Sequence, residues 1–265
     1  MLHLFTPEGE AALAAVMRRR PVLGFDFDGT LAPIVPHPDD ARIPAPVAER
    51  LQALSALCPV VVVSGRAVED LRGRLGFVPW HVVGSHGADD PTRLEAEAAA
   101  AAHAEALQPL REHLHRHAAD LAASGVTVED KRTSLALHYR RARSPGVARA
   151  LLLRLLDPAP AGVRIFGGKR VFNAAPQGAP DKARAMHDLV LRCAADCALF
   201  AGDDVNDEPV FESAPDDWLT VRVGRGRGGS RARFFIDGPQ QMAALLQLAL
   251  ERLREARAPA AAGPA

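Results

Sequence analysis

Short apolar runs alternate with segments of helical periodicity along most of this chain. Five apolar runs have the length of strands, at 22–25, 60–63, 81–83, 198–201 and 219–223. Apolar residues recur with the spacing of one helix face at 46–57, 68–75, 182–193, 207–213 and 240–256. This alternation predicts an α/β fold, a parallel sheet with helices on both faces.

The middle of the chain has a different pattern. An Ala-rich segment at 94–121 predicts a helix, and alternating runs at 126–129, 135–140, 163–166 and 170–173 predict antiparallel hairpins, with a helix at 147–156 between them. Ser64 and Lys182 are 118 positions apart, whereas one βαβ unit needs only about 30 residues. We therefore predict a catalytic core of residues 1–88 and 176–256, an inserted α+β cap domain at 89–175 that acts as a lid, and a disordered tail at 257–265.

Candidate chemistry begins where the first predicted strand ends. Asp26 and Asp28 follow the apolar run directly, and Gly29 and Thr30 come next. Two carboxylates at the end of a buried strand are costly unless a cation neutralises them. Mg²⁺ suits such a site because it prefers oxygen ligands and leaves positions open for a substrate phosphate. The segment therefore indicates metal-assisted phosphoryl chemistry, although Asp and Gly are also ordinary turn residues.

The ends of other predicted strands supply further polar groups. Ser64, Gly65 and Arg66 offer a hydroxyl and backbone N–H groups that could bind a phosphate. Lys182 opens a predicted helix, and three acids, Asp203, Asp204 and Asp207, follow the fourth apolar run. Acids this close repel one another unless a cation is present. Because ligands of open parallel sheets bind beyond the carboxyl ends of the strands, we expect these groups to meet in one crevice.

These residue types together predict a mechanism of phosphate transfer. Asp26 attacks phosphorus and forms an aspartyl-phosphate. Asp28 protonates the leaving alcohol and then deprotonates the hydrolytic water. Ser64 and Lys182 hold the transferring group, while Asp203 and Asp207 hold Mg²⁺.

Composition narrows the class of protein and its partners. The formal net charge of +0 gives no reason to expect nucleic acid or an anionic membrane as a partner. The three cysteines are sparse and odd in number, which is typical of a reducing, cytoplasmic compartment. We see no targeting segment and no stretch long enough to cross a bilayer, and we expect a monomer or weak oligomer. Lysine occurs only at 131, 169 and 182 in a chain rich in arginine, so each lysine is a candidate functional residue.

The motifs resemble a known superfamily. DFDGTL, VVVSGR, Lys182 and GDDVNDE stand in the order of the four motifs of the haloacid-dehalogenase-like phosphatases. The stretches GSHGA (84–88) and EDKRTSLALHYR (129–140) resemble the trehalose-6-phosphate phosphatase family within it. The resemblance implies a Rossmann-like core with an inserted α/β cap, Mg²⁺ dependence, a sugar phosphate as substrate, Asp26 as nucleophile and Asp28 as acid/base. It also implies metal ligation by Asp26, the backbone carbonyl of Asp28, and Asp203, and sugar contacts from His86, Lys131, His138, Tyr139, Arg140 and Asn173.

Three features of the sequence depart from the family pattern. Asn173-Ala174-Ala175-Pro176 replaces the usual Glu-x-Arg/Lys-Pro, Ala183 replaces a glycine, and Asn206 replaces a threonine. The first change removes two charged groups expected near the sugar and leaves sucrose phosphate and glucosylglycerol phosphate as alternative substrates. A dehalogenase would not need Asp28 or a metal, and a signalling receiver domain would not need a large lid. A sugar-binding regulator without activity is a further alternative, although every acid that the mechanism needs is present.

Overall fold

Two sheets organise the computed structural model, which describes residues 1–93, 96–226 and 229–258. The larger sheet is entirely parallel, in the order β1-β11-β10-β9-β2-β3-β4. Its strands are β1 (Leu2–His3), β2 (Pro21–Phe25), β3 (Val60–Val63), β4 (His81–Val83), β9 (Cys197–Gly202), β10 (Leu219–Val223) and β11 (Phe234–Ile236). The predicted parallel α/β fold is confirmed.

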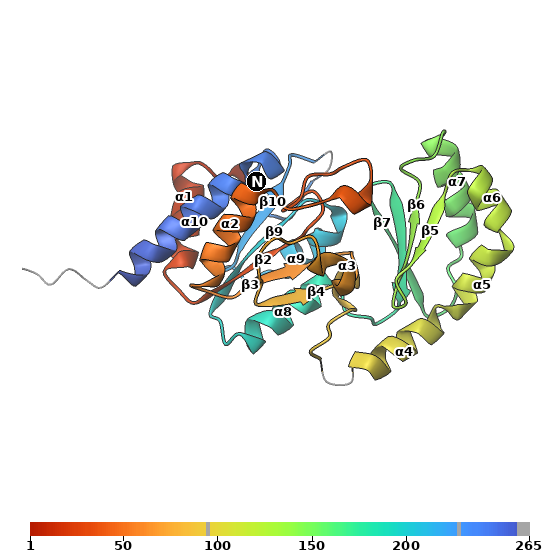
Figure 1. Ribbon diagram of the computed structural model, residues 1–265, viewed down its shortest axis with the longest axis horizontal. Helices are drawn as coiled ribbons and strands as arrows, with labels where there is room; N and C mark the ends of the chain where they lie inside the picture. The colour runs from red at the N-terminus through yellow and green to blue at the C-terminus, as the bar shows by residue number, and fades with distance from the viewer. Residues whose placement is uncertain (94–95, 227–228, 259–265) are drawn as a thin grey trace, which may run out of the picture.

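Helices form two groups over this sheet (Figure 1). One group contains α1 (Pro7–Met17), α2 (Ala45–Ser55) and α10 (Met242–Arg257), which pack against one another. In the other, α8 (Lys182–Arg192) packs against α9 (Glu208–Ser213), and the short helix α3 (Val68–Arg72) follows β3. The sheet is apolar through its middle: β2, β3 and β9 are buried along their whole length, as expected for parallel strands covered on both faces.

The smaller sheet is antiparallel, in the order β5-β6-β8-β7, and lies between β4 and α8 in the sequence. Its strands are β5 (Thr127–Asp130), β6 (Leu135–His138), β7 (Val163–Gly168) and β8 (Val171–Pro176). Three helices lie on the side away from the larger sheet, α5 (Gln108–Arg116), α6 (Ala118–Ala123) and α7 (Pro145–Leu156), and α4 (Ala96–Ala106) runs along the lower end of the smaller sheet toward them (Figure 1). We call these eight elements the antiparallel unit. It has a hydrophobic cluster of its own, separate from that of the parallel sheet.

The chain enters and leaves the antiparallel unit at neighbouring points. Gly87, just before the unit, has a φ of +116°, and a Cβ there would lie 2.4 Å from the backbone oxygen of Asp181, just before α8. Only glycine allows both this conformation and this close approach. The exact domain boundary at residue 176 stays a prediction, and Pro176 itself is the last residue of β8.

Several elements differ from the sequence prediction. Where a single helix was expected at 94–121, the structure has three helices, α4, α5 and α6. Residues 94–95 lie outside the described part. α5 has Pro109 in its first turn, where the missing N–H is harmless but an uninterrupted helix would lose a hydrogen bond. The tail predicted to begin at 257 begins later, because Arg257 ends α10; residues 259–265 lie outside the described part.

One α-helix and two strands were missed entirely: α1 and the short strands β1 and β11. The start of α1 does carry a sequence signal, since Thr6 caps the helix by accepting the Gly9 N–H, and Pro7 follows. None of the described helices is long and apolar enough to cross a membrane.

Candidate active site

Three neighbouring parallel strands bring the acidic groups to one edge of the larger sheet. β2 lies between β9 and β3, so the residues that follow these strands, Asp26, Ser64 and Asp203, share the carboxyl edge. Carboxylate oxygens of Asp26, Asp203 and Asp207 all lie within 4.8 Å of one another, and the three residues are buried. Oxygen donors grouped in this way fit a hard divalent cation such as Mg²⁺.

Lys182 balances part of this buried negative charge. Its Nζ donates hydrogen bonds of 2.7 Å to Oδ1 of Asp26 and 2.7 Å to Oδ1 of Asp207. Burial alone would lower the pKa of Lys182, but the carboxylates of Asp207 and Asp26 outweigh it and raise that pKa, so the ammonium stays charged. Burial raises the pKa of the Asp26 carboxyl well above its ordinary value, with Lys182 opposing the shift. The single ammonium of Lys182 therefore does not neutralise all the carboxylates of the cluster.

The buried carboxylate of Asp203 is only partly neutralised by its neighbours. Its side chain is buried, and its Oδ1 has no hydrogen-bond partner among the described residues. Its Oδ2 forms an ion pair with Lys169, in the turn between β7 and β8. Burial raises the pKa of Asp203 to about 6 even though Lys169 opposes the shift. A buried carboxylate oxygen without a partner is the kind of group that a bound metal ion satisfies.

Gly29 makes room for Asp203. Its φ is +86°, and a Cβ at this position would lie 2.0 Å from Oδ2 of Asp203. We expect Gly29→Ala to lower the free energy of unfolding by about 2 kcal/mol and to displace the carboxylate. Gly178→Ala is the matched control, because Gly178 has a φ of +92° but nothing within 4 Å of a Cβ. Equal losses of stability in denaturant titrations of the two variants would show that the approach to Asp203 is unimportant.

Asp28 does not join the acidic cluster but pairs with Arg66. Nε of Arg66 lies 2.7 Å from Oδ2 of Asp28, and Nη2 lies 2.8 Å from Oδ1. The same guanidinium reaches Asp70 at 2.7 Å. The structure therefore pairs the Arg66 side chain with Asp28. The predicted contact of Arg66 with phosphate would be made by the backbone of this loop. This pairing orients Asp28 beside the site, because a two-pronged guanidinium–carboxylate contact fixes the plane of both groups.

The predicted phosphate-binding loops lie at the same edge. Ser64 is buried, and its Oγ accepts the Arg66 N–H at 3.2 Å. Thr30 is also buried, and its Oγ1 has no partner within the described part of the chain. Hydroxyls buried without a partner are costly, so Thr30 is suited to contact a bound anion.

The antiparallel unit places several predicted substrate residues against this edge. Nζ of Lys131 donates to the Gly65 carbonyl at 2.9 Å, and the His86 ring meets Phe166 of β7 edge-on at 5.3 Å between centroids. Burial, together with Lys182 and Lys131, lowers the pKa of His86 well below its ordinary value, so its imidazole is neutral. Asn173 is buried, and its Nδ2 lacks a partner among the described residues. Lys131, His86 and Asn173 thus line the junction of the two sheets.

Other predicted substrate residues are placed differently. Nε2 of His138 lies 2.9 Å from Glu129, which is 3.5 Å from Nζ of Lys131. Tyr139 stacks on Phe172 inside the hydrophobic cluster of the antiparallel unit. Arg140 donates to the backbone oxygen of Lys169 at 3.3 Å. Sugar contacts by these three residues stay predictions, and the packing of Tyr139 gives that residue a structural role.

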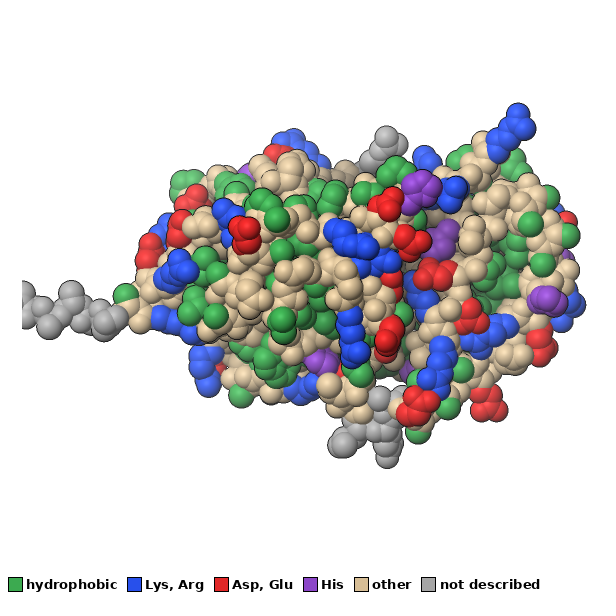
Figure 2. Space-filling view, viewed as in Figure 1, with side chains coloured by type: hydrophobic (Ala, Val, Ile, Leu, Met, Phe, Trp, Pro, Cys, Tyr) green, Lys and Arg blue, Asp and Glu red, His purple; other side chains and the backbone are tan. Residues whose placement is uncertain are grey.

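Lys169 is the one lysine to which the sequence assigned no role. All three lysines of the chain lie at this site: Lys182 on Asp26 and Asp207, Lys169 on Asp203, and Lys131 on Gly65. Figure 2 shows charged side chains of both signs along the junction between the two halves of the molecule. The scarcity of lysine in an arginine-rich sequence made Lys169 a candidate, but its pairing with Asp203 appears only in the structure.

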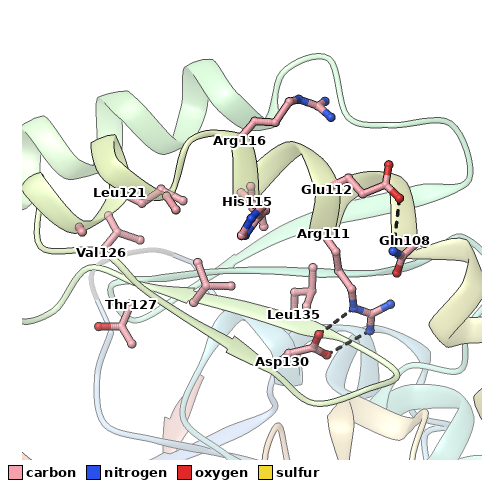
Figure 3. A pocket seen from close by; sticks show the side chains of 14 residues that line it. Gln108, Arg111, Glu112, His115, Arg116, Leu121, Val126, Thr127, Asp130 and Leu135 are labelled. Carbon is pink, nitrogen blue, oxygen red and sulfur yellow. Dashed lines mark hydrogen bonds and ion pairs between the residues drawn. The ribbon is translucent and has the colours of Figure 1, made fainter.

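A cavity lies away from this edge. A hollow of about 830 Å³ opens between α5, α6 and β5 in the antiparallel unit, with Leu121, Val126 and Leu135 among its lining residues (Figure 3). Two of its charged residues pair with each other, since Arg111 binds Asp130 at 2.7 Å. This hollow contains none of the acidic residues at the carboxyl edge.

A parallel sheet with buried acids and a lysine at its carboxyl edge, together with a separate antiparallel unit, defines a protein of the haloacid-dehalogenase-like fold. Solved structures share this fold. The C-terminal domain of C. albicans trehalose-6-phosphate phosphatase superimposes with a TM-score of 0.73 at 22% identity, covering 91% of this chain and 96% of that one. The sucrose-phosphatase of Synechocystis sp. PCC6803, solved with sucrose and phosphate, gives 0.54 at 19% identity, covering 88% and 98%.

Sequence comparison identifies the family. The trehalose-phosphatase family model matches residues 24–232, and the chain belongs to that family. The trehalose-phosphate phosphatase of Mycobacterium ulcerans (strain Agy99) is 33% identical over 238 residues, which cover 84% of this chain and 60% of the relative. For that of Mycobacterium tuberculosis (strain ATCC 25618 / H37Rv) the values are 33% over 257 residues, 91% and 64%. The chain thus spans about three fifths of the length of these relatives.

Proposed function

We propose that this protein is a Mg²⁺-dependent phosphatase that hydrolyses trehalose 6-phosphate to trehalose and phosphate. The observation that carries the proposal is the cluster of Asp26, Asp203 and Asp207 around Lys182 at the carboxyl edge of the sheet. The names of the curated relatives support the choice of substrate. The cysteines Cys58, Cys193 and Cys197 are free, which supports a reducing compartment, and we place the enzyme in the cytoplasm.

In the proposed mechanism, the carboxylate of Asp26 attacks phosphorus while the bond to the sugar oxygen breaks, which leaves an aspartyl-phosphate. Asp28 gives its proton to the departing sugar oxygen. Asp28 then takes a proton from water as that water attacks the aspartyl-phosphate, so that inorganic phosphate leaves and the Asp26 carboxylate is restored. The two-pronged contact with Arg66 holds Asp28 as a carboxylate, which is the state that takes a proton from water, so Asp28 leaves this contact to donate its proton in the first step.

Charge stabilisation comes from the groups around Asp26. Lys182 is positioned to stabilise negative charge that develops near Asp26. Ser64 and Thr30 would bind phosphate oxygens with their hydroxyls, and the backbone N–H groups of Gly29 and Gly65 lie in the same loops. Mg²⁺, held by Asp26, Asp203, Asp207 and the backbone carbonyl of Asp28, would neutralise phosphate oxygens and align them for attack.

The cap residues set the choice of sugar in this proposal. Lys131 and His86 line the junction of the two sheets, where a sugar attached to the phosphate would lie. Asn173 stands buried where relatives of this family usually have a charged residue. This observation favours one alternative, the same reaction on another sugar phosphate such as sucrose phosphate or glucosylglycerol phosphate.

The two possibilities separate in a phosphate-release assay with trehalose 6-phosphate, sucrose phosphate, glucosylglycerol phosphate and glucose 6-phosphate, each with Mg²⁺ or with EDTA. We expect kcat/KM for trehalose 6-phosphate to exceed the others by at least about 100-fold, because a site built to bind particular hydroxyls discriminates strongly against sugars that lack them. EDTA should abolish release for every substrate. Similar rates across the set, or no release from trehalose 6-phosphate, would contradict the proposed substrate.

A further inference from the structure

The tip of the β7–β8 hairpin docks onto the acidic loop that follows β9. The Lys169 ammonium pairs with Oδ2 of Asp203, and the Lys169 N–H donates to Oδ2 of Asp204 at 3.2 Å. A Cβ on Gly168 would lie 3.1 Å from the same Asp204 oxygen, so the glycine lets the hairpin approach closely. Two contacts from Lys169, one from its side chain and one from its backbone, thus join the antiparallel unit to the loop that holds Asp203 and Asp207.

The two partners of the ion pair at this tip differ in their exposure to solvent. The Asp203 side chain is 2% exposed, whereas that of Lys169 is 47% exposed. The carboxylate is fixed in the core and needs a cation, because burial without one is costly. The lysine reaches it from the open side and can return to water at little cost, since half-exposed ion pairs are weak.

A divalent cation bound by the acidic cluster would use the same carboxylate. One carboxylate oxygen from each of Asp26, Asp203 and Asp207 lies within 4.8 Å of the other two, and Lys169 is in contact with Oδ2 of Asp203. Two like charges that share one carboxylate repel each other. The Lys169 ammonium therefore weakens metal binding by Asp203, and a bound metal ion weakens the pairing of Asp203 with Lys169.

We propose that Lys169 is a stand-in cation that competes with the divalent metal for Asp203, so that docking of the hairpin and metal binding disfavour each other. The metal site itself rests on the proposed function. Without metal, Lys169 neutralises Asp203 and holds the antiparallel unit against the acidic loop. When metal binds, the pairing with Lys169 weakens, and the hairpin tip leaves the acidic loop more often.

Metal binding measured without substrate tests this competition. Mn²⁺ binding is followed by the electron paramagnetic resonance signal of the free ion in the wild-type protein, Lys169→Met and Arg170→Met. Arg170 is the matched control, because it is the next residue of the same turn, is exposed, and carries the same charge. We expect Lys169→Met to bind Mn²⁺ at least about fivefold more tightly than wild type, the factor expected from losing one partly exposed ion pair, and Arg170→Met to change affinity by less than about twofold.

Hydrogen exchange of the hairpin gives a second readout. In the wild-type protein, Mg²⁺ should speed exchange of the amides at 167–171, and Lys169→Met should show the fast rate without metal. Unchanged Mn²⁺ affinity in Lys169→Met, an equal gain in Arg170→Met, or slower hairpin exchange on addition of Mg²⁺ would overturn the proposal.

The outcomes also separate this inference from the proposed function. Absence of Mn²⁺ binding in all three proteins would overturn the metal site and the competition together. The expected binding and exchange results combined with no release of phosphate from trehalose 6-phosphate would support the competition and reject only the substrate.

Discussion

Asp26→Asn should reduce phosphate release by at least about 10⁴-fold while the protein stays folded, because an amide cannot form the aspartyl-phosphate. The substitution keeps the size of the side chain, and Lys182 retains its 2.7 Å contact with Asp207. Turnover is measured by phosphate release, and folding by thermal unfolding and circular dichroism.

Asp40→Asn is the control for this change. Asp40 is an exposed acid in the loop that follows Asp26, so the same chemical substitution there should leave turnover unchanged. Substantial residual activity in Asp26→Asn would mean that another group attacks phosphorus, and the covalent mechanism would have to be abandoned.

Lys182→Met should both abolish activity and lower the free energy of unfolding by about 3–5 kcal/mol. Removing the ammonium leaves Asp26 and Asp207 buried without the cation that they share, and breaking a buried ion pair in this way is costly. Denaturant unfolding with and without Mg²⁺ measures the effect. Because a divalent cation would neutralise the same carboxylates, Mg²⁺ should recover part of the lost stability.

The stability penalty of Lys182→Met should also depend on pH. A buried acid with a raised pKa takes up a proton more readily in the folded chain than in the unfolded chain, so protonation favours the folded state. Burial raises the pKa of Asp26 in the wild-type protein and Lys182 opposes that shift, so loss of the ammonium raises the pKa of Asp26 further. The penalty should therefore shrink as the pH falls and Asp26 takes up a proton.

Arg184→Met provides the comparison on the same helix. Arg184 is largely exposed and pairs with Asp188 on the surface, so its loss should cost less than about 1 kcal/mol. A penalty for Lys182→Met no larger than this would show that the acidic cluster does not depend on the lysine.

The features that could be predicted best from the sequence are strands and strand ends, because these depend on the local pattern of apolar residues. The strands β3, β4 and β10 begin and end at the predicted residues, and in β3 the reason is a run of consecutive apolar residues, which is typical of a covered parallel strand. Asp26, Ser64 and Asp203 could be placed together because the carboxyl ends of parallel strands share one edge. The short strands β1 and β11, which lie side by side at one end of the sheet, were missed.

Side-chain partners between distant segments could not be predicted. Arg66 meets Asp28 across two different loops, and Lys169 reaches Asp203 only because the two sheets adopt one particular relative position. The packing of Tyr139 in the hydrophobic cluster could have been predicted from the sequence. It alternates with Leu135 and Leu137, which are buried in the same cluster, and such alternation indicates the packed face of a strand.

The close approach of Gly87 to Asp181 has a consequence for how this architecture can change. Because the chain departs from and returns to the parallel sheet at nearly one point, everything between these residues is a loop whose ends are already joined. The entropy of closing such a loop grows only slowly with its length. An unrelated module grafted between these two residues would therefore leave the folding of the parallel sheet almost undisturbed, provided that the glycine is retained.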